Sequence, residues 1–182
     1  MTERFDILLT PGPTPLPLQV REALGRPIIH HRTAPYRALF TRALQGMQAI
    51  LQTTQPVFCL TSSGTGAMEA AVVNLLSPGD EAVVILGGKF AERWRHLCQA
   101  FGAQAIPIPV AYGEAVDPEQ VRQALAAHPE AKAVFATLCE TSTGVVHDIQ
   151  AIAALVRTTN AVLVVDAISG LVADDCKTDA WG

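Results

Sequence analysis

The sequence predicts an α/β fold with a mostly parallel sheet and helices on both of its faces. Short apolar runs alternate with segments of helical character, as in a parallel sheet whose strands are joined by helices. The runs are continuously apolar, as expected of strands buried on both faces. The expected strands are residues 57–60, 82–86, 105–110, 133–138 and 161–165. The expected helices between them are residues 66–76, 90–101, 118–127 and 149–158.

The N-terminal part of the chain precedes this alternation. Residues 5–17 read FDILLTPGPTPLP, and the prolines among them prevent a long helix or a regular strand. We therefore expect residues 1–20 to form an extended arm and residues 21–182 to form the α/β domain. Residues 35–51 predict a helix, because Pro35 suits a first turn and apolar side chains recur at helical spacing.

Turn and end signals mark the rest of the chain. Residues 77–80, SPGD, are typical of a turn, and Asp117 followed by Pro118 predicts a helix cap and a first-turn proline. After the apolar run that ends at Val165, residues 166–182 contain no expected helix or strand that closes the sheet. We interpret the chain as the N-terminal fragment of a longer protein.

Composition excludes several classes of protein. The 182 residues are 49% apolar and carry a net charge of −4, which argues against disorder and against nucleic-acid binding. No apolar run approaches the roughly 18 residues of a membrane span, and the N-terminus lacks the apolar core of a signal peptide. The four cysteines lie far apart, which predicts reduced thiols in a cytoplasmic protein and no metal site.

A run of small residues, SSGTG at 62–66, separates the first expected strand from the first expected helix. Such residues let backbone N–H groups face outward at a helix N-terminus, where a phosphate can bind. The P-loop pattern fails around Gly88–Lys89. The dinucleotide pattern fails because Glu69 replaces its third glycine and no acid ends the next strand. A phosphate on a small cofactor and a ligand-free turn remain as alternatives.

Other strand ends carry side chains suited to a cofactor. The run at 133–138 leads into the hydroxyl-rich turn 140–144, and the last run ends at Asp166. A carboxylate at the end of a buried strand needs a partner, either the next turn or a group such as a protonated pyridine nitrogen. Phe90 offers either a core side chain or a flat surface at a site. Together with SSGTG, these loops predict a pyridoxal-phosphate site at one edge of the sheet.

Five motifs, in this order and spacing, carry a resemblance to a known family: LLTPGPTPLP, HHRTAPY, TSSGTGAMEA, ETSTG and VDAISGL. Over its whole length the chain resembles the class V, fold type I pyridoxal-phosphate aminotransferases. Within them it is most similar to the alanine–glyoxylate and serine–glyoxylate (serine–pyruvate) enzymes. The resemblance implies a truncated large domain of a type I pyridoxal-phosphate transferase, with the small C-terminal domain absent.

The resemblance also implies roles for individual residues. Six residues match cofactor-binding positions of the family: Gly64 and Thr65 at the phosphate, Phe90 stacked on the pyridine ring, Ser142 near its phenolic oxygen, Asp166 on its nitrogen and Ile168 beneath it. Gly12 matches the point where the N-terminal arm meets the substrate.

The chain departs from the family pattern in two places. Leu138 stands where relatives often carry a histidine, two residues before the glutamate of ETSTG. The Schiff-base lysine of the family is expected beyond Gly182, and the three lysines that are present, Lys89, Lys132 and Lys177, lie in contexts unlike its motif. We therefore expect no catalytic residue within this chain, and no transamination by the chain alone.

The resemblance implies that the intact protein moves an amine from a small amino acid (alanine or serine) to a 2-oxo acid (glyoxylate or pyruvate). Expected partners are these small molecules and a second copy of the chain, with no nucleic acid and no membrane. Two alternatives stay open. One is a pyridoxal-phosphate lyase or cysteine desulfurase, and the other is a truncated chain without catalysis.

Overall fold

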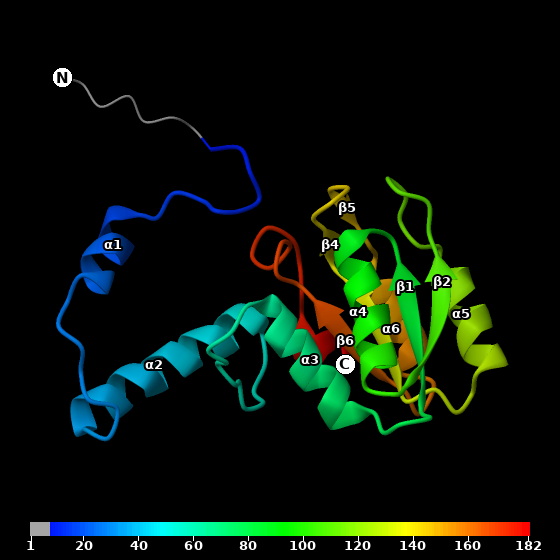
Figure 1. The fold of residues 1–182 in the computed structure, drawn as a ribbon, viewed down its shortest axis with the longest axis horizontal. Helices are drawn as coiled ribbons and strands as arrows, with labels where there is room; N and C mark the ends of the chain where they lie inside the picture. Colours follow the sequence, from blue (N-terminus) through cyan, green and yellow to red (C-terminus); the bar gives the residue numbers. More distant parts are fainter. Residues whose placement is uncertain (1–7) are drawn as a thin grey trace. The chain divides into compact units, whose positions relative to one another are not determined.

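The computed structural model describes residues 8–182, which divide into two compact units on either side of the Gln45–Gly46 bond (Figure 1). The first unit holds helix α1, Leu18–Leu24, and most of helix α2, Ala34–Leu51. Residues 8–17 form no helix or strand. Helix α1 begins directly after Pro17 and takes up the last three residues of the range expected to be extended. The rest of the expected arm, residues 1–7, lies outside the described residues.

Helix α2 agrees with the expected helix 35–51 to within one residue. Thr33 precedes it, and the Thr33 hydroxyl accepts a hydrogen bond of 3.4 Å from the backbone amide of Tyr36. None of its residues is buried in this chain, and apolar side chains such as Phe40 and Met47 are exposed. The apolar stripe that predicted the helix is therefore present without being covered.

A four-stranded parallel sheet forms the centre of the second unit, in the order β2-β1-β3-β6 (Figure 1). Its strands are β1 (Glu81–Leu86), β2 (Gln104–Pro109), β3 (Ala133–Thr137) and β6 (Val162–Asp166). Each lies within one residue of an expected strand. The expected parallel α/β fold is confirmed.

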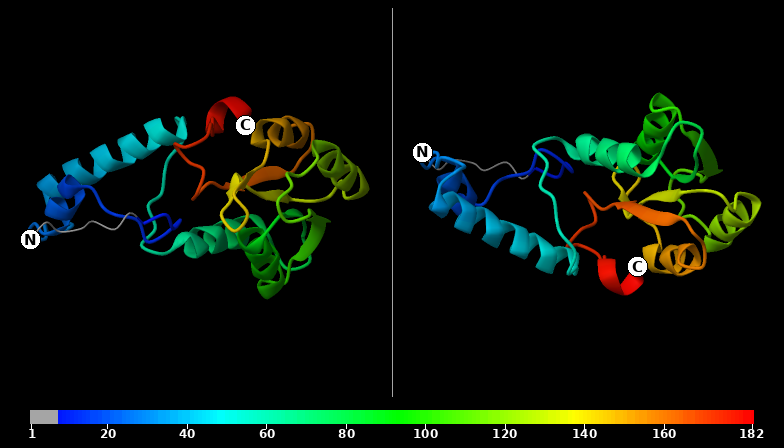
Figure 2. Two further views of the ribbon diagram at one scale, coloured as in Figure 1. Left: turned by 90° about the horizontal axis from the view of Figure 1, so that it is seen from above. Right: turned by 90° about the horizontal axis from the view of Figure 1, so that it is seen from below.

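Helices cover both faces of this sheet, as Figure 2 shows from above and below. Helices α3 (Gly64–Leu75) and α4 (Lys89–Ala100) pack on one face, and α5 (Pro118–Ala127) and α6 (Ile149–Val156) on the other. Successive strand residues alternate between the two layers. Val84 and Phe135 face α3 and α4, whereas Val83 and Val134 face α5 and α6. Burial on both sides explains why the strand sequences are continuously apolar.

The prediction of the first strand is wrong. Residues 57–60 form no strand, and the side chain of Phe58 is 84% exposed. An apolar run becomes a strand only when a neighbour pairs with its backbone groups. Among residues 8–182, no strand pairs with this segment.

The C-terminal segment is more ordered than expected. After β6, residues 178–181 form a short helix, α7 (Thr178–Trp181), where no element was expected. The carboxylate of Asp179 anchors this helix. It accepts hydrogen bonds of 2.8 and 3.0 Å from the amide and the hydroxyl of Thr54, and one of 2.5 Å from the hydroxyl of Thr53. These contacts join residues more than 120 positions apart, so local sequence patterns give no sign of them.

Candidate functional site

The carboxyl ends of the parallel strands meet at one edge of the sheet. Thr137 and Asp166 lie opposite each other in the β3–β6 register, and β1 ends at Leu86 beside them. The loops that follow these strands lead to α4, to the small antiparallel pair β4 (Cys139–Glu140) and β5 (Val145–Val146), and to the segment after Asp166. Ligands of parallel α/β domains bind at this edge.

A cavity of about 380 Å³ lies beside this edge, between α3 and the end of β6. Three of the sequence-predicted residues line it: Gly64, Asp166 and Ile168. Apolar side chains of Met68, Trp94 and Leu171 line other parts of it. The cavity is thus largely apolar, with one carboxylate in its wall.

Gly64 approaches the end of the Ile168 side chain closely. A Cβ atom added to Gly64 would lie 2.6 Å from Cδ1 of Ile168. A side chain at position 64 would therefore displace Ile168, which is 65% exposed and can turn aside. Ser63 precedes α3 without a capping side-chain hydrogen bond, so no side chain satisfies the first-turn N–H groups there.

Asp166 uses one carboxylate oxygen locally. The backbone amide of Ile168 donates a hydrogen bond of 3.1 Å to Oδ1, which is the turn-capping alternative considered from the sequence. Among the described residues, none donates a hydrogen bond to Oδ2. The neighbouring hydroxyl of Thr137 is also buried without a partner in this part of the chain. Asp166 in the cavity wall and Thr137 opposite it in the sheet thus both have unused hydrogen-bonding capacity.

Arg93, which the sequence analysis did not single out, joins two predicted site residues. Its Nη1 donates a hydrogen bond of 2.7 Å to the hydroxyl of Thr65, and its guanidinium carbon lies 5.0 Å from the centre of the Phe90 ring. No acidic side chain within residues 8–182 forms an ion pair with it. The signal in the sequence was its position one helical turn after Phe90, which places both side chains on one face of α4.

Glu140 was also missed as a site residue, although it is fully buried. Its carboxylate accepts hydrogen bonds from the backbone amides of Phe90 and Ala91 at 3.4 and 3.0 Å. It also accepts bonds from the amide and hydroxyl of Ser142 at 3.1 and 2.6 Å. Burial raises the pKa of this carboxyl, but the Ser142 hydroxyl and the three backbone amides outweigh it and hold the pKa below its ordinary value.

Two of the three hydroxyls of the 140–144 turn, those of Thr141 and Ser142, have different partners. Ser142 donates its one hydroxyl hydrogen to Glu140 and accepts a hydrogen bond of 3.1 Å from the amide of Lys89. Thr141 instead hydrogen-bonds with the hydroxyl of Ser169, in the segment that follows Asp166. Ser142 therefore has no hydrogen left to donate to a ligand, because a hydroxyl carries only one.

His147 contacts the chain at two further points near this turn, Val116 and Gly87. It is buried, and its Nδ1 accepts a hydrogen bond of 3.0 Å from the backbone amide of Val116. Burial lowers the pKa of this imidazole, and the charge of Glu140 only partly offsets that effect. A Cβ on Gly87 would lie 2.9 Å from Nε2 of His147, so the ring packs directly against the chain as it leaves β1.

The remaining predicted residues lie elsewhere. Gly12 belongs to the first compact unit. No lysine of the described residues lines the 380 Å³ cavity. Lys89 and Lys177 instead form ion pairs with Glu92 and Asp175, at 3.1 and 3.0 Å. Within residues 8–182, no cluster of three or more His, Cys, Asp or Glu side chains could hold a metal ion, and no helix is long and apolar enough to cross a bilayer.

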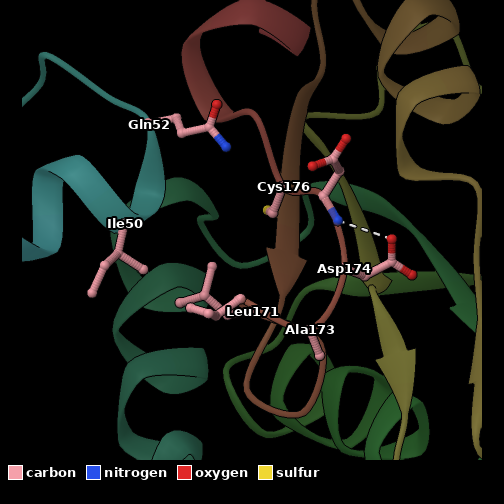
Figure 3. A pocket seen from close by; sticks show the side chains of 8 residues that line it. Ile50, Gln52, Leu171, Ala173, Asp174 and Cys176 are labelled. Atoms are coloured by element: carbon pink, nitrogen blue, oxygen red, sulfur yellow. Dashed lines mark hydrogen bonds between the residues drawn. The ribbon is translucent and has the colours of Figure 1, made fainter.

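A larger hollow of about 480 Å³ lies beside the segment that follows Ile168 (Figure 3). Its lining includes Ile50, Gln52, Leu171, Ala173, Asp174 and Cys176. The backbone amide of Asp175 donates a hydrogen bond of 2.9 Å to the carboxylate of Asp174 there. None of the sequence-predicted site residues lines this hollow. The smaller, more apolar cavity is therefore the better candidate site.

Comparison with known proteins agrees with this geometry. Residues 8–182 match the family model for class-V aminotransferases. The chain belongs to this family. The expected family and the type I transferase fold are thereby confirmed.

The chain is also similar to individual named proteins. The chain is 41% identical over 179 residues to the soluble hydrogenase 42 kDa subunit of Anabaena cylindrica. The match covers 97% of this chain and 47% of that protein. It is 36% identical over 187 residues to the L-aspartate–glyoxylate aminotransferase of Paracoccus denitrificans. That match covers 100% of this chain and 47% of that protein.

A solved structure, the alanine–glyoxylate aminotransferase of a Nostoc species, superposes with a TM-score of 0.91 at 27% identity. The match covers 100% of this chain and 49% of that one. The chain therefore spans about half the length of the relatives it matches.

Proposed function

We propose that the intact protein is a pyridoxal-phosphate-dependent aminotransferase. It exchanges an amine between a small amino acid, alanine or serine, and a 2-oxo acid, glyoxylate or pyruvate. The observation that carries this proposal is the apolar cavity in which Gly64, Asp166 and Ile168 meet at the carboxyl edge of the sheet. The names of the glyoxylate aminotransferases among its relatives support the choice of acceptor.

The residues present suit a flat aromatic cofactor with a phosphate. The missing Cβ of Gly64 leaves Ile168 as a close apolar surface, on which one face of a pyridine ring packs. Phe90 is the candidate for the other face. The unused Oδ2 of Asp166 accepts a hydrogen bond from a protonated ring nitrogen, while Oδ1 stays fixed by Ile168. A carboxylate so anchored keeps its direction when the ligand binds.

The phosphate belongs, in this proposal, at the N-terminus of α3. That helix presents N–H groups that no side chain caps, and the hydroxyl of Thr65 lies in its first turn. Arg93 contacts this hydroxyl at 2.7 Å and adds a positive charge. A helix N-terminus and a guanidinium together favour a dianion. Thr141 contacts the hydroxyl of Ser169 in the loop after Asp166, whereas Ser142 accepts its hydrogen bond from Lys89 at the start of α4.

Bound pyridoxal phosphate supplies an electron sink for the substrate carbanion. Asp166 supports it by holding the proton on the ring nitrogen, and the apolar lining excludes water from the ring. The lysine that moves the substrate proton is expected beyond Gly182. We therefore propose that residues 1–182 alone bind the cofactor weakly and do not transaminate.

Two alternatives differ in what they require. A cysteine desulfurase generally stacks a histidine on the ring, whereas this chain carries Phe90. A non-catalytic chain requires that no lysine motif follows Gly182. One relative is named as a hydrogenase subunit. That name describes the relative, and we do not propose the activity for this chain.

We also propose a cytoplasmic homodimer. The exposed apolar side chains of α2, Phe40 and Met47 among them, and the proline-rich segment around Gly12 support this arrangement. In it, the arm of one subunit meets the substrate of the other.

The complete encoded polypeptide tests the function. It is incubated with pyridoxal phosphate, glyoxylate and either alanine or serine, and glycine is quantified by chromatography. Glycine formation that depends on the amino donor supports the proposal, with Asp166→Ala as the inactive control. Release of sulfide or alanine from cysteine, without glycine formation, contradicts it.

A further inference from the structure

Helix α4 begins without a capping side chain of its own. Its N-cap residue is Gly88, which has no side chain, and its first-turn amides belong to Lys89, Phe90 and Ala91. Uncapped amides at a helix start are costly when buried, because no water replaces the missing acceptors. Ala91 is buried, so this helix requires acceptors from elsewhere in the chain.

The 140–142 turn supplies these acceptors from about 50 residues away. Glu140 accepts bonds from the amides of Phe90 and Ala91, and Ser142 accepts one from the amide of Lys89. Ser142 in turn donates to Glu140, which locks the two side chains together. All three first-turn amides are thus capped from the same turn, two by the buried Glu140 and one by the exposed Ser142.

The packing of Glu140 and Ser142 leaves no room for a side chain at the N-cap position, Gly88. A Cβ on Gly88 would lie 2.5 Å from the carboxyl carbon of Glu140 and 2.5 Å from the hydroxyl oxygen of Ser142. The absence of a side chain at the N-cap is what lets the glutamate reach the amides. Sequence and geometry therefore agree that a carboxylate from another loop replaces the usual cap.

We propose that Glu140 is a positioning residue that holds Phe90, through the first turn of α4, in the orientation that stacks on the cofactor ring. This inference rests on the proposed function. Phe90 is the second residue of the capped turn, so its backbone position depends directly on the carboxylate. Arg93, which lies over the Phe90 ring and bonds to Thr65, extends the same support to the phosphate side.

The ionised state of Glu140 fits this role. The positive end of the helix dipole and four hydrogen bonds stabilise the carboxylate, as its lowered pKa indicates. Glutamine in its place keeps the size but offers one acceptor oxygen and adds two N–H donors that face the same amides. Glu140→Gln therefore breaks the cap without emptying the space.

A double-mutant cycle in the complete encoded polypeptide tests the role. The probe is pyridoxamine 5′-phosphate, which has the ring and phosphate of the cofactor but no aldehyde to react with lysine. Glu140→Gln is expected to raise its Kd about tenfold, as the loss of one charge-assisted hydrogen bond does. In a Phe90→Leu background the same change is expected to alter Kd less than about twofold, because the two residues act as one unit.

Two further measurements separate positioning from general destabilisation. Without ligand, the amides of Phe90 and Ala91 are expected to exchange hydrogen faster in Glu140→Gln, while those of β1 and β3 keep their protection. Glu119→Gln, a glutamate in the first turn of α5 on the other face of the sheet, is the matched control and is expected to change neither readout.

The outcomes are distinct. Equal Kd changes with and without Phe90, or unchanged amide exchange in Glu140→Gln, overturn the positioning role. Absence of probe binding by the unmodified protein overturns the proposed function, and the positioning role with it. If Glu140→Gln does not fold, Gly88→Ala replaces it in the cycle, because its Cβ displaces the carboxylate while every hydrogen-bonding group remains.

Discussion

The carboxylate of Glu140 accepts a hydrogen bond of 3.0 Å from the backbone amide of Ala91, 49 residues earlier in the chain. This contact joins β4, which follows β3, to α4, which follows β1. Both elements follow loops that leave the carboxyl edge of the sheet, where the candidate cofactor site lies. The site is therefore built from segments that support one another.

Arg93 is expected to contribute to binding through the phosphate. Arg93→Met keeps most of the side-chain volume but removes the charge and the hydrogen bond to Thr65. Loss of a hydrogen bond to a charged group predicts a Kd for pyridoxamine 5′-phosphate about tenfold to a hundredfold higher. Calorimetric titration with pyridoxamine, which lacks the phosphate, provides the comparison. An equal loss for both ligands would show that Arg93 does not act on the phosphate.

An alanine at Gly64 is expected to displace the Ile168 side chain with little loss of stability. Gly64→Ala places a Cβ 2.6 Å from Cδ1 of Ile168, but that side chain is 65% exposed and can turn aside, so the expected cost is about 0.5 kcal/mol or less. Gly46→Ala is the matched control, because nothing lies within 4 Å of its Cβ and it sits inside α2. That change is expected to stabilise by about 0.5–1 kcal/mol, as alanine does in a helix interior. Urea unfolding of both variants measures the difference, and a loss of more than about 1 kcal/mol in Gly64→Ala would show that Ile168 is fixed in place.

Acid is expected to destabilise the protein through His147. Its folded pKa lies below the ordinary value of 6.5, so the unfolded chain binds more protons as the pH falls. Stability is then independent of this group above about pH 6.5 and declines below it, until the folded pKa is reached. Glu140 stays ionised across this window, because its pKa is lowered from 4.5.

His147→Asn isolates this contribution. The amide oxygen of asparagine can accept the hydrogen bond from Val116, but it does not titrate. Thermal unfolding between pH 7 and pH 5 is expected to show a smaller loss of stability in this variant than in the unmodified protein. Equal slopes would assign the acid sensitivity to other groups.

The sequence predicted those parts of the fold that depend on local patterns. Continuous apolar runs located β1, β2, β3 and β6, and helical spacing located the main helices to within a few residues. Residues 57–60 were misassigned because an apolar run shows the tendency to be buried but not whether a strand lies beside it. Helix α7 was missed because its anchor, the contact between Asp179 and Thr54, joins distant parts of the chain.

The candidate site shows the same division. A carboxylate at the end of an expected strand pointed to Asp166, since position along a parallel strand determines the edge that it reaches. Gly64 was singled out by the small residues that open a helix, although the strand expected before it is absent. Glu140 and Arg93 escaped notice because their roles depend on contacts between loops. Sequence order alone also gave no indication that the Ser142 hydroxyl donates to Glu140.

The protonation state of the cofactor's ring nitrogen reports whether Asp166 contacts it. The complete encoded polypeptide is loaded with pyridoxal phosphate labelled with ¹⁵N in the ring, and its nitrogen chemical shift is followed across pH. We expect the nitrogen to stay protonated well above the pH at which it titrates in the free cofactor, because Oδ2 of Asp166 holds the proton. Asp166→Asn is expected to abolish this shift. A ring nitrogen that titrates as in the free cofactor, or equally in both proteins, would contradict the assignment of the cofactor to this edge of the sheet.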